Sequence, residues 1–101
     1  MTLDLSKVEL IENEDRGRFE AHVGDLKAVM YRYYDDGSIV ITHTLVPDEL
    51  TGQGLAGHMA RIVLDGAREQ GLSVVPICPY VAAYIKRHPE YQDLVQRGPD
   101  Q

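Results

Sequence analysis

The sequence has few of the features that mark secreted or membrane proteins. It contains one cysteine, Cys78, which cannot form a disulfide within the chain, and unpaired cysteines are typical of a reducing compartment. No apolar run approaches the roughly 20 residues that span a bilayer. Residues 1–7 lack the basic start and the long apolar stretch of a secretory signal. These absences predict a soluble, cytoplasmic protein that does not use a membrane.

Positive charge is also scarce, with 10 Lys and Arg residues against 16 Asp and Glu residues and a formal net charge of −6. Nucleic-acid-binding surfaces usually carry a basic stripe, so DNA or RNA is not expected as a partner. His22, His58 and His88 show no ligand-like spacing with Cys78 or with acidic residues, so no metal site is expected. A chain of 101 residues has the usual length of one domain, and we expect residues 1–101 to form one.

The first half of the sequence predicts an antiparallel meander of about four strands. Apolar and polar side chains alternate between turn residues, as in strands with one buried face. The predicted strands are Val8–Asn13, Arg18–Val23, Leu26–Tyr34 and Ser38–Val46. Asp35-Asp36-Gly37 is a strong signal for a hairpin between the last two. In the fourth strand, the alternation puts Ile39, Ile41 and His43 on one face.

The second half changes to a helical period. Apolar residues at i, i+4, i+7 and i+8 from Leu55 predict an amphipathic helix that ends near Gly71. Leu72–Cys78 is typical of a short buried strand, and Pro79 can begin a second helix that ends at His88. The element order β-β-β-β-α-β-α predicts an α+β fold or a three-layer sheet-and-helix domain.

A glycine-rich loop over residues 46–57 joins the two halves. It follows a predicted strand and opens a predicted helix, so several unobstructed backbone N–H groups gather at a helix N-terminus. Such a terminus carries roughly half a positive charge and has unpaired donors, which suit a phosphate or diphosphate group. The loop therefore predicts a phosphorylated cofactor, and an ordinary tight turn is the alternative.

Three groups of residues carry a resemblance to a known family. They read His43-Thr44-x-Val46-Pro47, then Leu50-x-Gly52-Gln53-Gly54-Leu55-Ala56, and finally Val75-Pro76-x-Cys78-Pro79-Tyr80-Val81-x-x-Tyr84-x-x-x-His88-Pro89-x-Tyr91. Together they resemble the GNAT (N-acetyltransferase) superfamily, and in particular its small, single-domain GNAT-like subfamily. The resemblance covers residues 8–96. It implies a minimal GNAT-like fold in which the strands splay apart in a V beyond Leu45 and Val46, at the end of the fourth strand.

The resemblance also implies that the loop binds acetyl-CoA or free coenzyme A. The superfamily loop pattern, Arg/Gln-x-x-Gly-x-Gly/Ala, is matched at Gly54 and Ala56, whereas Thr51 replaces the usual Arg or Gln. The cofactor-binding residues implied by this match lie in the loop and at the end of the preceding strand. They are Leu45, Val46, Gly52, Gln53, Gly54, Leu55, Ala56 and Gly57.

Three side chains could take part in amine acetylation, and each has a plainer interpretation. The resemblance implies Tyr84 as the acid that protonates the departing thiolate, and an ordinary core tyrosine is the alternative. Cys78, before a helix-starting proline, could accept the acetyl group or be a small buried residue. His43 could act as the base for the incoming amine or be a half-buried, hydrogen-bonded histidine. The glutamate that many GNAT enzymes carry on this strand is absent, and the neighbouring residue is Leu45.

These residues predict an acetyl-CoA-dependent N-acetyltransferase that acts on an unidentified amine. The alternative is a non-catalytic module of the same fold that binds CoA or acetyl-CoA, or that binds another protein. Both a monomer and a dimer remain open.

Overall fold

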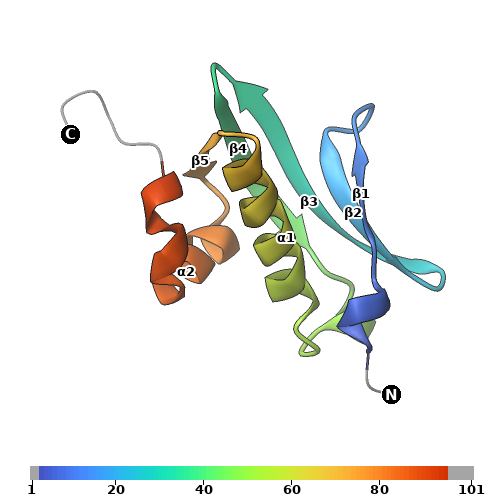
Figure 1. Cartoon of the computed structure of the whole chain (residues 1–101). Helices are drawn as coiled ribbons and strands as arrows, with labels where there is room; N and C mark the ends of the chain where they lie inside the picture. The colour runs from blue at the N-terminus through green and yellow to red at the C-terminus, as the bar shows by residue number, and fades with distance from the viewer. Residues whose placement is uncertain (1–2, 96–101) are drawn as a thin grey trace.

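A five-stranded mixed sheet forms the frame of the computed structural model, which describes residues 3–95 (Figure 1). The strands lie in the sheet in chain order, and the first four pair antiparallel. They are β1 Leu10–Asn13, β2 Arg18–Val23, β3 Leu26–Asp35, β4 Ser38–Leu45 and β5 Ser73–Pro76. The last strand, β5, joins β4 in parallel, after the crossover through a helix that a parallel pair requires. The predicted meander of four strands is confirmed.

Two α-helices and three short 3₁₀ helices complete the described part of the chain. They are η1 Leu5–Lys7, η2 Asp48–Leu50, α1 Leu55–Glu69, α2 Pro79–Arg87 and η3 Pro89–Leu94. As predicted, α1 ends before Gly71, which has a φ of +71°. The amides of Gly71 and Leu72 turn back to the carbonyls of Arg68 and Ala67, at 3.2 and 2.9 Å. This paired bonding is the Schellman closure that a left-handed glycine allows.

The hydrophobic core lies between the sheet and the two α-helices. Its fully buried side chains include Met30 and Ile41 from the sheet, Met59 and Leu64 from α1, and Val81 from α2. Because both helices contribute to the same core, they form a single helical layer (Figure 1). The α+β class is therefore confirmed, with one helical layer in place of the three layers considered from the sequence.

The hairpin between β3 and β4 has the predicted turn and an irregularity that was not predicted. Asp36 and Gly37 both have positive φ, 46° and 81°, as in a two-residue hairpin turn. Further along, Tyr31 pairs with His43 but Arg32 pairs with Ile41, so β4 contains one extra residue there. Such a bulge reverses the alternation of side chains. The predicted placement of His43 on the same face as Ile41 is therefore wrong.

The strands β4 and β5 separate before β4 ends. Their ladder ends at the pair Ile41 and Pro76, and one further bond joins the Cys78 amide to the Ile41 carbonyl at 2.8 Å. The chain then turns into α2, while β4 continues to Leu45. The predicted V-shaped splay is present, but it begins after Ile41 and not beyond Leu45 and Val46.

Candidate functional site

The loop between β4 and α1 is shaped by a short helix and two glycines. After Pro47, η2 turns the chain and anchors it in the core through the buried side chain of Leu50. Gly52 and Gly54 follow with φ values of +81° and +80°. Only glycine adopts such angles without strain, so these two positions fix the path of the backbone into α1.

The amides of this loop are free donors. Within residues 3–95, the six N–H groups of residues 52–57 have no acceptor in the protein. Three of them belong to the first turn of α1, where helix geometry leaves N–H groups without a partner. Because the positive end of the helix dipole lies at the same place, the loop is suited to a negatively charged group.

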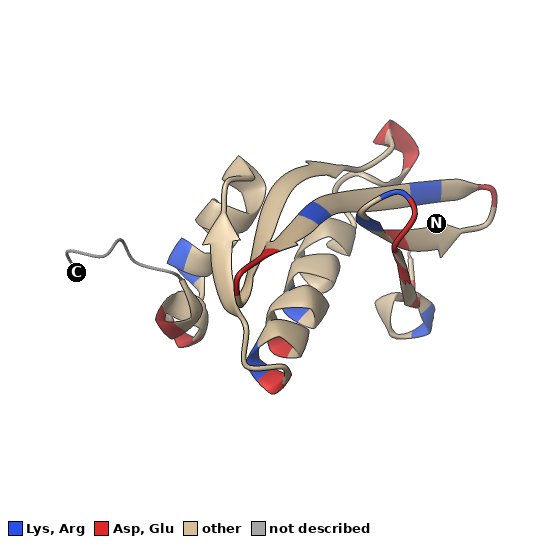
Figure 2. Cartoon of the chain, turned by 90° about the horizontal axis from the view of Figure 1, so that it is seen from above, with Lys and Arg blue, Asp and Glu red and all other residues tan. Residues whose placement is uncertain are grey.

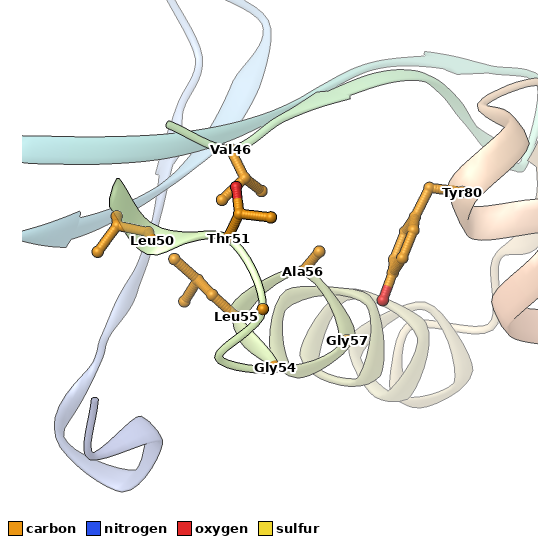
Figure 3. A pocket seen from close by; sticks show the side chains of 9 residues that line it. Val46, Leu50, Thr51, Gly54, Leu55, Ala56, Gly57 and Tyr80 are labelled. Atoms are coloured by element: carbon orange, nitrogen blue, oxygen red, sulfur yellow. The ribbon is translucent and has the colours of Figure 1, made fainter. Parts of the chain in front are cut away.

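A pocket of about 360 Å³ opens over these amides (Figure 3). Its walls come from the end of β4, η2, the glycine loop, the first turn of α1 and one side chain of α2. The lining residues are Val46, Leu50, Thr51, Gly52, Gly54, Leu55, Ala56, Gly57 and Tyr80. Six of the predicted cofactor-binding residues thus lie together, and the volume is in the usual range for a small-molecule site.

The two other predicted cofactor-binding residues do not line this pocket. Leu45 is 58% exposed at the end of β4. The side chain of Gln53 ties the loop to neighbouring backbone, since its Oε1 accepts a bond from the Leu3 amide at 2.8 Å and its Nε2 donates to the Glu49 carbonyl at 3.4 Å. Gln53 therefore braces the loop from outside the pocket.

No charged side chain lines the pocket. Asp48 and Glu49 make the preceding turn acidic, and the first Lys or Arg after this turn is Arg61 in α1. The hydroxyl of Thr51 is already used, because it donates to the Pro47 carbonyl at 3.2 Å. Negative charge in this pocket would therefore be held by backbone amides and the helix dipole.

Tyr80, near the start of α2, is a pocket residue that the sequence analysis did not identify as part of the site. Its hydroxyl points toward the first turn of α1 (Figure 3). A Cβ atom built on Gly57 would lie 3.3 Å from this oxygen and 3.6 Å from Cε2 of Tyr84. Gly57 therefore permits the close approach of α2. Both tyrosines lie near Gly57, but only Tyr80 lines the pocket.

Tyr84 lies one turn further along α2 and is buried. Its ring stacks on that of His88 with centroids 3.9 Å apart, and it also packs against Tyr91. Burial raises the pKa of Tyr84, although the positive charge of Arg61 opposes this effect. The phenol is therefore protonated at neutral pH, as a proton donor must be.

Cys78 lies at the point where β4 and β5 separate. It is buried, it precedes Pro79 at the start of α2, and its Sγ lies 3.3 Å from Oγ1 of Thr44. Thr44 lies near the end of β4, two residues before Val46, and Cys78 lies two residues before Tyr80. The pair therefore lies further into the opening between β4 and α2 than the pocket walls Val46 and Tyr80.

His43 lies on the other face of the sheet. It pairs with Tyr31, whose hydroxyl accepts a bond from Arg18 at 2.8 Å, whereas Thr44 pairs with the buried Met30. The His43 ring is exposed and meets the Tyr31 ring edge-on, with centroids 6.5 Å apart. The structure thus brings Tyr84 and Cys78 to the helical side of the sheet and does not bring His43 there.

In the described residues, no helix is long and apolar enough to cross a membrane. Over the same residues, no three His, Cys, Asp or Glu side chains lie close enough together to bind a metal ion.

A family model for the GCN5-related N-acetyl-transferases matches residues 18–94. The match takes in the pocket loop, both α-helices and four of the five strands. The chain therefore belongs to the GCN5-related N-acetyl-transferase family, and the predicted resemblance to the GNAT superfamily is confirmed.

Individual relatives agree with this assignment. The chain is 28% identical over 97 residues to Protein NATD1 of Xenopus tropicalis, covering 93% of this chain and 89% of that protein. It is 33% identical over 75 residues to Protein NATD1 of Mus musculus, covering 74% and 68%. Its fold matches the NMR solution structure of a GCN5-like protein from Staphylococcus aureus with a TM-score of 0.70, at 28% identity and over 90% of each chain.

Proposed function

We propose that this protein transfers the acetyl group of acetyl-CoA to an amine. The observation that carries the proposal is the row of free amides at residues 52–57, at the base of a pocket and at the N-terminus of α1. Membership of the GCN5-related N-acetyl-transferase family supports this activity. The acceptor amine is not identified.

The residues present fit a CoA-type cofactor. Gly52 and Gly54 have no side chain above the amides, so a diphosphate could approach the backbone closely. The apolar walls Val46, Leu55 and Ala56 suit an uncharged pantetheine arm. When bound, acetyl-CoA would supply an activated acetyl thioester. With Thr51 in place of Arg or Gln, we expect weaker binding than a loop with that side chain would give.

Tyr84 is the proposed acid. In direct transfer, the amine nitrogen bonds to the acetyl carbon and gives up a proton to water, the carbon–sulfur bond breaks, and the departing sulfur takes a proton. The phenol of Tyr84 is protonated at neutral pH and has no hydrogen-bond partner within residues 3–95. It is therefore free to donate that proton.

Cys78 is an alternative acceptor for the acetyl group. In a two-step reaction its sulfur would bond to the acetyl carbon as CoA leaves, and the amine would then displace it. Thr44, 3.3 Å away, could exchange a hydrogen bond with the sulfur. The plainer interpretation, a small buried residue at the end of a strand, remains open.

A second candidate function is a non-catalytic module that binds CoA, acetyl-CoA or another protein. One observation favours it: His43, the proposed base, lies on the opposite face of the sheet from Tyr84 and Cys78. An amine that is already neutral would need no base, so this observation bears on rate and does not exclude transfer.

Thermal unfolding with acetyl-CoA, CoA and ATP tests the binding step. A ligand at 100 times its Kd stabilises by about 2.7 kcal/mol, which is a rise in Tm of about 10 °C or more for a domain of this size. We expect the rise with acetyl-CoA and CoA and not with ATP. No response to any of them would contradict the proposal.

A screen of amine acceptors then tests catalysis. We expect turnover above background with at least one amine, and a loss of about 100-fold in kcat for Tyr84→Phe with unchanged CoA affinity. Tyr33→Phe, on an exposed strand position, is the matched control. Tight CoA binding without turnover of any amine would favour the non-catalytic module.

A further inference from the structure

The pocket has one unused hydrogen-bond donor among its side chains. Of the lining residues, only Thr51 and Tyr80 carry a hydroxyl, and the others are apolar or glycine. The Thr51 hydroxyl donates to the Pro47 carbonyl. The Tyr80 hydroxyl has no hydrogen-bond partner in the part of the chain that the structure describes. Tyr80 is therefore the one lining side chain with a hydrogen to donate to a ligand.

The position of this hydroxyl matches the position of the free amides. It lies beside Gly57, whose own N–H is the last of the six free amides. Figure 3 shows the Tyr80 ring forming the α2 wall of the pocket, with its oxygen directed at the first turn of α1. A group held by these amides would thus lie within reach of the hydroxyl.

Tyr80 is also in the right protonation state to donate. Burial raises the pKa of its phenol, an effect that the positive charge of Arg87 partly opposes. The group therefore stays neutral at physiological pH. A neutral phenol donates to an anionic oxygen without adding charge repulsion, and bonds of this charge-assisted kind are stronger than neutral ones.

We propose that the Tyr80 hydroxyl donates a hydrogen bond to the diphosphate of the bound cofactor, in a loop where Thr51 supplies no such contact. This inference rests on the proposed binding of CoA to the loop. It gives α2 a part in recognising the anionic end of the cofactor, with Gly57 as the position that allows the approach.

Binding measurements on Tyr80→Phe test the inference. The substitution keeps the ring that forms the pocket wall and removes only the hydroxyl. By calorimetry, we expect the affinity for CoA and for acetyl-CoA to fall by the same factor, roughly tenfold or more, as for one hydrogen bond to a charged acceptor. Tyr33→Phe is the control, and the thermal unfolding of each free variant verifies its fold.

The possible outcomes separate this inference from the function on which it rests. If the wild-type chain binds no CoA, the proposed function fails. If the wild-type chain binds CoA and Tyr80→Phe binds it equally well, only the role of Tyr80 is wrong. A loss confined to acetyl-CoA would also overturn the inference, because it would move the contact from the diphosphate to the thioester.

As a second variant, Gly57→Ala should lower the affinity for CoA. The added methyl group would lie 3.3 Å from the Tyr80 hydroxyl, which must then shift by a few tenths of an ångström from its position beside the amides. In combination with Tyr80→Phe it should cause a smaller further loss than it causes alone. Additive losses would contradict a shared contact.

Discussion

The β1–β2–β3 end of the sheet and the loop between β4 and α1 treat their polar groups in opposite ways. In the sheet, each buried charge has partners: Arg18 Nε lies 2.7 Å from Oε2 of Glu20, and Arg32 lies 2.7 Å from Glu12. The loop has no charged side chain at its pocket, and the donors of residues 52–57 lack acceptors among the described residues. Figure 2 shows Lys and Arg positions (blue) and Asp and Glu positions (red) on the strands and their turns.

This difference separates charges that stabilise the fold from groups that are available to bind a ligand. A buried charge is costly unless it is paired, so the ion pairs of the sheet are accounted for by folding. Arg32 also lies over the ring of Tyr34, 4.7 Å from its centroid, and the Tyr34 hydroxyl donates to Glu12. Both buried arginines of this group are therefore held by carboxylates of the sheet. The uncharged loop, whose donors are free, is the better candidate for an anion site.

The largest effect that would test this comparison is the loss of Arg32. We expect Arg32→Met to lower the free energy of unfolding by about 2–3 kcal/mol, because the Glu12 carboxylate loses its buried partner. The Glu12 side chain is still partly exposed to water, which limits the loss. CoA affinity of the folded variant should not change. Urea unfolding and calorimetry measure the two quantities, with the exposed Lys27→Met as control. A fall in CoA affinity would mean that the sheet charges take part in binding after all.

A smaller effect is expected at the glycines with positive φ. Gly54 in the loop and Gly24 in the β2–β3 turn have φ values of +80° and +59°. Alanine costs about 1–2 kcal/mol in such a conformation, so both Gly54→Ala and Gly24→Ala should lose stability. Only Gly54→Ala should also lose CoA affinity, by roughly tenfold, because relaxing its strain moves the free amides.

The Gly24→Ala variant serves as the matched control for backbone strain, since a Cβ at that position meets no atom within 4 Å. Equal CoA affinity in the two variants would mean that the path of the loop through Gly54 does not determine binding.

The sequence predicted the strands and the loop because their signals are local. The Asp36-Gly37 turn and the closure of α1 at Gly71 depend on residues within a few positions of each other. The same holds for the glycines of the loop, so six of the eight predicted cofactor-binding residues line one pocket. Local chemistry of this kind is what a single sequence records.

What could not be predicted depends on non-local packing. The extra residue in β4 has no compositional mark, yet it moves His43 to the face opposite Cys78. Helical periodicity puts Tyr80 and Tyr84 near each other, and both approach Gly57. Only the position of the pocket shows that Tyr80 is the one that lines it. Pairs such as Arg32 with Glu12, 20 residues apart, also require the strand order to be known.

The substitution with the smallest expected effect at neutral pH concerns Glu20 in the sheet. Its carboxylate can be protonated in acid, whereas the loop amides cannot. The hydrogen bond from Arg18, followed by the contact with His22, lowers the pKa of Glu20 to about 2 from an ordinary 4.5. The folded state therefore binds fewer protons than the unfolded state between these values. The stability that Glu20 contributes is fully present above about pH 4.5 and is lost as pH falls toward 2. Carboxyl NMR shifts measure this pKa directly, and titration near 4.5 would contradict the pairing.

His22→Ala, at a half-exposed side chain, should raise the pKa of Glu20 and move the acid loss of stability to higher pH. The free amides of residues 52–57 do not titrate, so the same substitution should leave CoA binding at neutral pH unchanged.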